Sequence, residues 1–233
     1  MLSDSHHFRK MLAGVCMIAG PLLLLVVEVI HPELREEEAA QLGVIADNAD
    51  SWFAAHLIAL PAIALLVVAA LGLMHMLRER EVAWGHIGGG LALLGLLAFV
   101  GVVAMELVAW QMVKGGADPA EMTALLERLN EEPGIVVPLY VVGLVGVVAG
   151  FVALAIGLYR ARAVQSWMAG FIIVGIGFFL AENLAYENWL GIVGAAFLLV
   201  GLGSIGRMVM QESDGDWEHT PEYKGFRPLA GMR

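Results

Sequence analysis

Charged residues are scarce in this sequence, and cysteine is almost absent. Charged side chains make up 15% of the 233 residues, whereas soluble domains carry about 25%. The single cysteine, Cys16, excludes an intramolecular disulfide and any cysteine cluster that could bind zinc or an iron–sulfur centre. Acidic residues outnumber basic ones, and the formal net charge of −10 is unfavourable for a nucleic-acid partner.

Sequence patterns typical of an enzyme active site are also lacking. The few serines have no histidine and acid at hand, and no phosphate-binding loop is present. Gly201, Gly203 and Gly206 have the spacing of a dinucleotide-binding fingerprint, but they end an apolar run instead of following a strand. We therefore expect a protein without catalytic residues.

Long apolar runs, by contrast, are abundant. Hydrophobic residues make up 59% of the chain, and each run is long enough to cross roughly 30 Å of hydrocarbon as a helix. The pattern predicts an all-α integral membrane protein, a six-transmembrane-helix bundle with spans at about 11–31, 52–77, 84–113, 135–160, 165–184 and 188–207. Residues 1–10 are then an N-terminal segment, 11–207 the transmembrane domain, and 208–233 a flexible tail.

The distribution of lysine and arginine predicts the orientation of the bundle. One side of the predicted membrane carries most of these residues: Arg9, Lys10, Arg78, Arg80, Arg160, Arg162, Arg207, Lys224, Arg227 and Arg233. The other side carries only Arg35, Lys114 and Arg128. Since cytoplasmic loops are enriched in basic residues, both termini are expected in the cytoplasm, with the protein in the plasma (inner) membrane.

The two longer outer loops are expected to contain short amphipathic helices. Asp118, Pro119 and Glu121 combine a helix-capping residue, a proline at the first helical position and an acid at the third. Residues 33–46 show a similar pattern. These helices either cap the bundle or form a lid or docking surface. In the tail, Trp217, Tyr223 and Phe226 could dock onto the bundle or onto a partner.

A few ionisable residues lie near the outer ends of four spans. Glu28 and His31 are three residues apart and share a helix face, and the others are His56, Glu106 and Glu182. Residues 182–188 are expected to form a tight hairpin at the surface, which would leave Glu182 in water. Because an ionised carboxylate in hydrocarbon is costly, such groups face the interior of a bundle, pair, bind ions or become protonated.

Three interpretations of this polar cluster stay open. The residues can simply close the bundle at its wet edge. Glu28, His31, His56 and Glu106 can instead bind a transition metal, or the two histidines can hold a haem. The carboxylates can also form a path for protons or cations.

Three functions correspond to these interpretations. The first is a non-enzymatic accessory or assembly subunit, which meets the lipid bilayer and associates with other subunits, or with itself, through glycine-rich helix faces. The second is a metal- or haem-binding redox protein of the membrane. The third is a small proton- or cation-coupled transporter.

Overall fold

The computed structural model describes residues 5–131, 136–219 and 225–227, and these contain helices and no strand. Six of the helices are long and apolar enough to cross a membrane: α1 (Ser5–Ile30), α3 (Ala49–Met76), α4 (Val82–Lys114), α6 (Val136–Arg160), α7 (Ser166–Ala185) and α8 (Asn188–Gln211). The prediction of six apolar helices is thus confirmed, and they are consistent with a multi-pass membrane protein. The largest differences from the expected spans lie at the two ends, where α1 begins earlier and α8 ends later.

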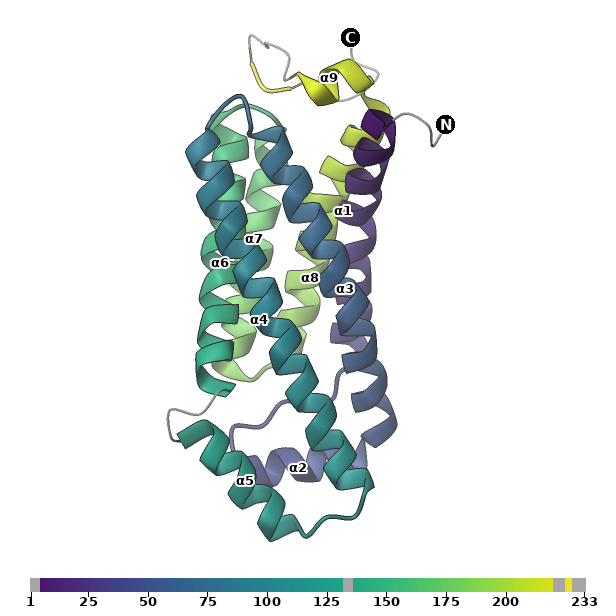
Figure 1. Cartoon of the computed structure of the whole chain (residues 1–233), viewed down its shortest axis with the longest axis vertical. Coiled ribbons are helices and arrows are strands. Elements are labelled where there is room, and N and C mark those ends of the chain that lie inside the picture. The colour runs from purple at the N-terminus through teal and green to yellow at the C-terminus, as the bar shows by residue number, and fades with distance from the viewer. Residues whose placement is uncertain (1–4, 132–135, 220–224, 228–233) are drawn as a thin grey trace.

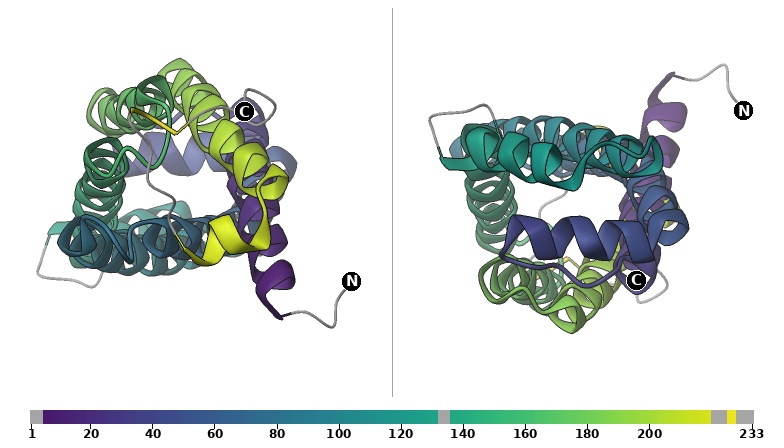
Figure 2. Two further views of the ribbon diagram at one scale, coloured as in Figure 1. Left: turned by 90° about the horizontal axis from the view of Figure 1, so that it is seen from above. Right: turned by 90° about the horizontal axis from the view of Figure 1, so that it is seen from below.

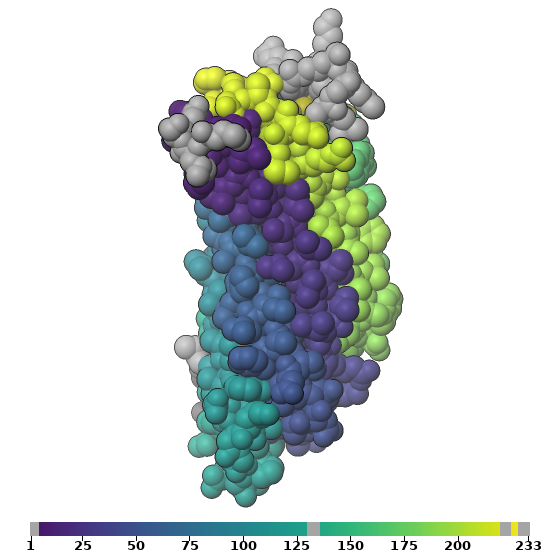
Figure 3. Space-filling view, turned by 90° about the vertical axis from the view of Figure 1, so that its right-hand side faces the viewer, coloured from purple at the N-terminus to yellow at the C-terminus, as the bar shows by residue number. Residues whose placement is uncertain are grey.

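The six long helices form a closed ring, in the order α1, α3, α4, α6, α7 and α8, with α8 packing back against α1 (Figures 1 and 2). In the space-filling view, α1 lies between α3 and α8 along the bundle (Figure 3). The outside of the ring is apolar, with exposed side chains such as Ile87, Leu94 and Leu97. A ring of this kind buries one face of each helix and offers the other to lipid.

Glycines allow the closest helix contacts within the ring. A Cβ added to Gly95 on α4 would lie 2.4 Å from the backbone nitrogen of Val147 on α6. One added to Gly150 on α6 would lie 2.3 Å from the backbone nitrogen of Ala92. Small residues at such seams let two backbones approach, which drives helix association in lipid. These glycines therefore pack within the chain.

The end of the bundle that we call the cap end carries two further helices, α2 (Glu38–Asp47) and α5 (Pro119–Glu131). They lie across this end of the ring (Figure 2). Leu42 and Ile45 of α2 pack with Trp52 of α3 and Met122 of α5 in a small apolar cluster. The α2 and α5 segments are thus held on the ring by side chains, and a location on the membrane surface stays a prediction.

The opposite end, the terminal end, carries the first residues of α1, the last residues of α8, and α9 (Asp214–Glu218) (Figure 1). Trp217 is buried and stacks on His75 of α3, with ring centroids 4.3 Å apart. Lys10 is buried, donates to the backbone oxygen of Glu212 over 2.8 Å, and pairs with Asp214 at 2.5 Å. The described part of the tail therefore packs against the bundle.

Tyr223 lies outside the described residues, as do Lys224 and Arg233. Phe226 contacts Tyr159, with ring centroids 5.5 Å apart. Arg227 is buried and forms an ion pair with Glu212. The flexibility predicted for the whole of residues 208–233 stays a prediction.

The two halves of the ring differ in packing. The half near the terminal end contains many of the large side chains with less than 2% exposure: Leu73, Leu77, Leu154, Leu158, Met168, Ile172 and Ile205. In the half near the cap end, the helices surround a cavity. The core therefore closes one half of the ring and leaves the other half hollow.

Candidate functional site

A cavity of about 530 Å³ lies inside the ring, in its cap half. All six long helices line it, and at the cap end it reaches Arg35 and Glu36, which are exposed. From there it extends along the bundle to Leu66 and Leu202. Cavities of 300–1,000 Å³ are typical of binding sites for small molecules. The cavity is thus accessible from the cap end and closed toward the terminal end.

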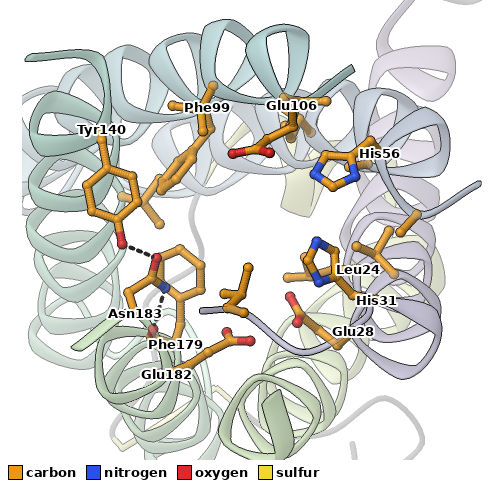
Figure 4. A pocket seen from close by; sticks show the side chains of 18 of the residues that line it. Leu24, Glu28, His31, His56, Phe99, Glu106, Tyr140, Phe179, Glu182 and Asn183 are labelled. Carbon is orange, nitrogen blue, oxygen red and sulfur yellow. Dashed lines mark hydrogen bonds between the residues drawn. The ribbon is translucent and has the colours of Figure 1, made fainter. Parts of the chain in front are cut away.

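The five ionisable residues singled out from the sequence all line this cavity (Figure 4). They come from separate elements: Glu28 from α1, His31 from the residue after α1, His56 from α3, Glu106 from α4 and Glu182 from α7. The helix ring therefore brings to one cavity residues that are up to 154 positions apart in the sequence.

The expectation that Glu182 lies in a wet hairpin is wrong. α7 continues to Ala185, and the turn begins at Tyr186, whose positive φ of 55° ends the helix. Glu182 is only 5% exposed. Its carboxyl lies beside that of Glu28 on α1, close enough for a hydrogen bond when one of the two groups is protonated (Figure 4). The two acids thus form a carboxyl pair between α1 and α7.

Gly191 of α8 leaves room for this carboxyl pair. A Cβ at position 191 would lie 2.3 Å from a carboxylate oxygen of Glu182. Any side chain there would push the Glu182 carboxyl away from its present place. The pair between α1 and α7 therefore depends on a glycine in a third helix, α8. The residues around Glu28 and Glu182 in the sequence give no sign of this dependence.

The two histidines and Trp52 pack together as three mutually tilted rings at one side of the cavity. The ring centroids of His31 and His56 are 5.0 Å apart, and Trp52 lies 4.9 Å from His31 and 4.6 Å from His56. His31 Nδ1 contacts the backbone oxygen of Pro32 at 2.7 Å, and His56 Nδ1 contacts that of Trp52 at 2.8 Å. Because a carbonyl oxygen only accepts, both Nδ1 atoms carry the proton.

In the neutral imidazole, each Nε2 is then an acceptor without a protein partner. His56 is only 6% exposed, and its ring faces the cavity (Figure 4). Burial lowers the pKa of His31, which lies just beyond the end of α1, although its hydrogen bond to Pro32 acts in the opposite direction. Both rings therefore offer a lone pair to the cavity.

Glu106 has a carboxyl group without a hydrogen-bond partner among the residues that the structure describes. Its own backbone oxygen accepts from Trp52 Nε1 over 3.3 Å, which fixes α4 against α3 at this level. Its carboxyl points into the cavity across from the Glu28–Glu182 pair (Figure 4). An unpaired carboxyl in an apolar bundle requires a proton, a cation or water.

Sequence reasoning missed Tyr140 and Asn183, which form the other side of the site. Tyr140 O–H donates to Asn183 Oδ1 over 2.7 Å, and Asn183 Nδ2 donates to the backbone oxygen of Phe179 over 2.7 Å (Figure 4). Phe99 lies near both aromatic rings of this group, with its ring centroid 6.3 Å from that of Tyr140 and 5.8 Å from that of Phe179. The sequence analysis assigned Glu182 and Asn183 to the hairpin. In the structure both residues belong to the last turns of α7 and line the cavity.

The described residues add no metal ligand to the set predicted from the sequence. Among the residues that the structure describes, no three or more His, Cys, Asp or Glu side chains form a group that could hold a metal ion. His31 and His56 each present a lone pair, and this is the part of the predicted set of Glu28, His31, His56 and Glu106 that fits a ligand role. Metal or haem binding stays a prediction.

Comparison with known proteins gives no relative for this chain: no family model, no curated protein and no solved structure matches it.

Proposed function

We propose that this protein is a small proton- or cation-coupled carrier that binds its solute in the cap-half cavity. The observation that supports this most is the unpaired Glu106 carboxyl, which faces an accessible cavity opposite the Glu28–Glu182 pair. Such groups are rare inside membrane proteins and mark ion pathways and proton relays.

The arrangement suits an exchange of protons for cations. Glu28 and Glu182 hold one proton between them, and releasing it leaves a second negative charge in the cavity. A cation that enters from the cap end compensates that charge, since uncompensated charge in an apolar bundle is costly. His31 and His56 face the same space and accept a proton or a hydrogen bond, and Glu36, Glu38 and Arg35 line the entrance.

An accessory-subunit role is supported less well. Gly95 and Gly146 approach each other between α4 and α6, and Gly14 approaches Gly206 between α1 and α8. These glycines are used inside the chain and leave fewer small-residue faces for another subunit. Association with other subunits stays a prediction.

We further propose that both termini face the cytoplasm and that the cavity opens outward from the plasma membrane. The excess of basic residues at the terminal end supports this orientation.

Transport by the purified protein in liposomes tests the proposal. A potassium gradient with valinomycin makes the lumen negative, a trapped pH-sensitive dye reports proton entry, and labelled sodium reports cation entry. We expect the protein to raise at least one flux above that of protein-free vesicles, and Glu106→Gln to remove the increase.

Glu121→Gln is the matched control, because Glu121 is exposed on α5 and does not line the cavity. It should transport like the unchanged protein. The proposal is contradicted if neither protons nor sodium enter faster with the protein, or if Glu106→Gln transports normally.

A further inference from the structure

The cavity presents hydrogen-bond acceptors to its contents. Glu28, Glu182 and Glu106 contribute carboxyl oxygens, and His31 and His56 contribute Nε2 lone pairs. Neutral imidazoles with Nδ1 protonated have no second N–H to donate.

Most side-chain donors at the polar level of the cavity are already used by the protein. Tyr140 O–H donates to Asn183, Asn183 Nδ2 donates one N–H to the backbone oxygen of Phe179, and Trp52 Nε1 donates to that of Glu106. Both histidine N–H groups also donate to backbone oxygens, so of these side chains only Asn183 keeps an N–H for a ligand. Acceptors therefore outnumber free donors here, which favours a ligand that brings its own donors.

Three other side chains with donor groups line the cavity: Arg35, Gln41 and Tyr186. Arg35 pairs with Glu33, and Gln41 Nε2 is buried without a partner. The charge balance still favours a cation, because the described lining contains five carboxyl side chains and one guanidinium: Glu28, Glu36, Glu38, Glu106, Glu182 and Arg35.

The deeper part of the cavity is apolar. Below the polar level it is lined by Ile63, Leu66, Leu96, Phe151, Leu198 and Leu202. Beside the carboxyl groups stand the aromatic rings of Phe99 and Phe179, 5.8 Å apart. Aromatic faces attract cations, and an apolar floor favours a hydrocarbon body.

We infer that the ligand of this cavity is an amphipathic organic ammonium ion, with an N–H-bearing charged group among Glu28, Glu106 and Glu182 and an apolar body against the floor. The ammonium donates to the unpaired acceptors, and its positive charge balances the excess of carboxyl groups in the lining. This inference rests on the proposed function, because it names the substrate class of the same cavity.

Equilibrium binding to the full chain in nanodiscs tests the inference without requiring transport. The probe is 4-phenylbutylammonium, measured by calorimetry against empty nanodiscs. Three comparison compounds each change one property of the probe. 4-Phenylbutanol lacks the positive charge, and 4-phenylbutyrate carries a negative charge instead. The N-trimethylated probe keeps the positive charge but lacks the N–H donors.

We expect the ammonium to bind most tightly. The alcohol and the trimethylated compound should bind about 10-fold or more weakly, as the loss of charge-assisted hydrogen bonds predicts. The carboxylate should not bind above the level of empty nanodiscs. Equal binding of the ammonium and the alcohol, or tighter binding of the carboxylate, would overturn the inference.

Variants locate the binding site. Glu106→Gln should weaken ammonium binding about 10-fold or more and leave binding of the alcohol unchanged, which also shows that the variant is folded. Glu121→Gln should change neither. The inference is overturned if Glu106→Gln leaves ammonium binding intact.

The two proposals fail in different ways. Selective ammonium binding without any proton or sodium flux in liposomes contradicts the carrier function and supports the ligand class. Flux that depends on Glu106, together with no preference for the ammonium, supports the carrier and overturns the ligand class.

Discussion

The cap half and the terminal half of the ring are formed by the same six apolar helices but differ in how their buried polar groups are paired. In the terminal half, buried charges are paired: Lys10 with Asp214, and Arg227 with Glu212. In the cap half, Glu106 and the Nε2 atoms of both histidines face a cavity without protein partners. Unpaired polar groups in a bundle mark function, whereas paired ones hold structure.

Packing separates the two halves in the same way. Leu73, Leu77 and Ile205 fill the terminal half with no measurable exposure. In the cap half, Leu66 and Leu202 mark the depth at which the cavity ends. The terminal half is therefore closed by a packed core, whereas the cap half encloses a cavity. The predictions below test this contrast.

The largest expected contrast comes from inserting one aromatic ring into each half of α3. Ala70 has 0% exposure in the terminal half, so Ala70→Phe, which inserts a whole ring, should overpack the core and lower the free energy of unfolding by about 3 kcal/mol or more. Ala59 lines the cavity, so Ala59→Phe has space for its ring. Thermal unfolding in detergent compares the two variants.

Ala59→Phe also fills part of the binding site. It should weaken binding of 4-phenylbutylammonium while the fold persists. If Ala59→Phe is as destabilising as Ala70→Phe, then the cap half is not hollow in the membrane.

A smaller effect is expected at the α4–α6 seam. A methyl group on Gly95 would lie 2.4 Å from the backbone of α6, so Gly95→Ala should separate the helices and destabilise the protein by about 1–3 kcal/mol. Gly90, on the same helix, has nothing within 4 Å of an added Cβ. Gly90→Ala should be neutral or stabilising, because alanine is a better helix former.

Denaturation in mixed micelles measures this pair of variants. Leu96 of α4 and Val147 of α6 lie at this helix contact and line the cavity. Gly95→Ala should therefore weaken binding of 4-phenylbutylammonium, and Gly90→Ala should not. Equal stability of the two variants would show that α4 and α6 do not pack this closely.

The smallest effect is expected at the α9 contact. Hydrogen bonds from Lys10, and then from His7, hold the pKa of Asp214 below its ordinary value of 3.8. A carboxylate whose pKa is lowered on folding stabilises the folded state above its unfolded pKa, and this contribution is lost as the pH falls through the folded pKa. Acidification from pH 7 to below 3.8 should therefore loosen α9.

Trp217 reports this change, because it is buried against His75. Its emission, taken as the difference between the protein and Trp217→Phe, should shift to the red at low pH. Asp214→Asn should shift it already at pH 7, whereas Asp47→Asn at the exposed cap end should not. An unchanged signal in Asp214→Asn would mean that the ion pair does not hold α9.

Much of the fold follows from the sequence, because a run of about 20 apolar residues can satisfy its backbone in lipid only as a helix. The predicted spans therefore agree closely with α3, α4, α6 and α7. The last span was predicted to end at Arg207, but α8 continues to Gln211. Hydropathy marks where a helix leaves the lipid, and a helix can continue beyond that point.

The candidate site was predicted in its residues but not in all their surroundings. Glu182 and Asn183 were assigned to a surface hairpin because two adjacent polar residues at the end of an apolar run indicate water. In the structure they lie inside α7 and face the cavity side of the ring. Polarity in the sequence does not distinguish bulk water from a polar cavity. Gly191 and Tyr140 were missed because each acts through a contact with a residue of α7: Gly191 leaves room for Glu182, and Tyr140 donates to Asn183.

The sequence alone determined that six helices are long and apolar enough to cross a membrane. It also placed the carboxyl and imidazole groups of four helices near one level, because both properties depend only on distance along a helix. Tertiary structure alone decided which way each helix turns, that Glu28 meets Glu182, and that Glu106 faces open space. Helix rotation is set by contacts such as Gly95 with α6 and Gly14 with α8, between residues far apart in the chain. Those contacts exist only once the ring has closed.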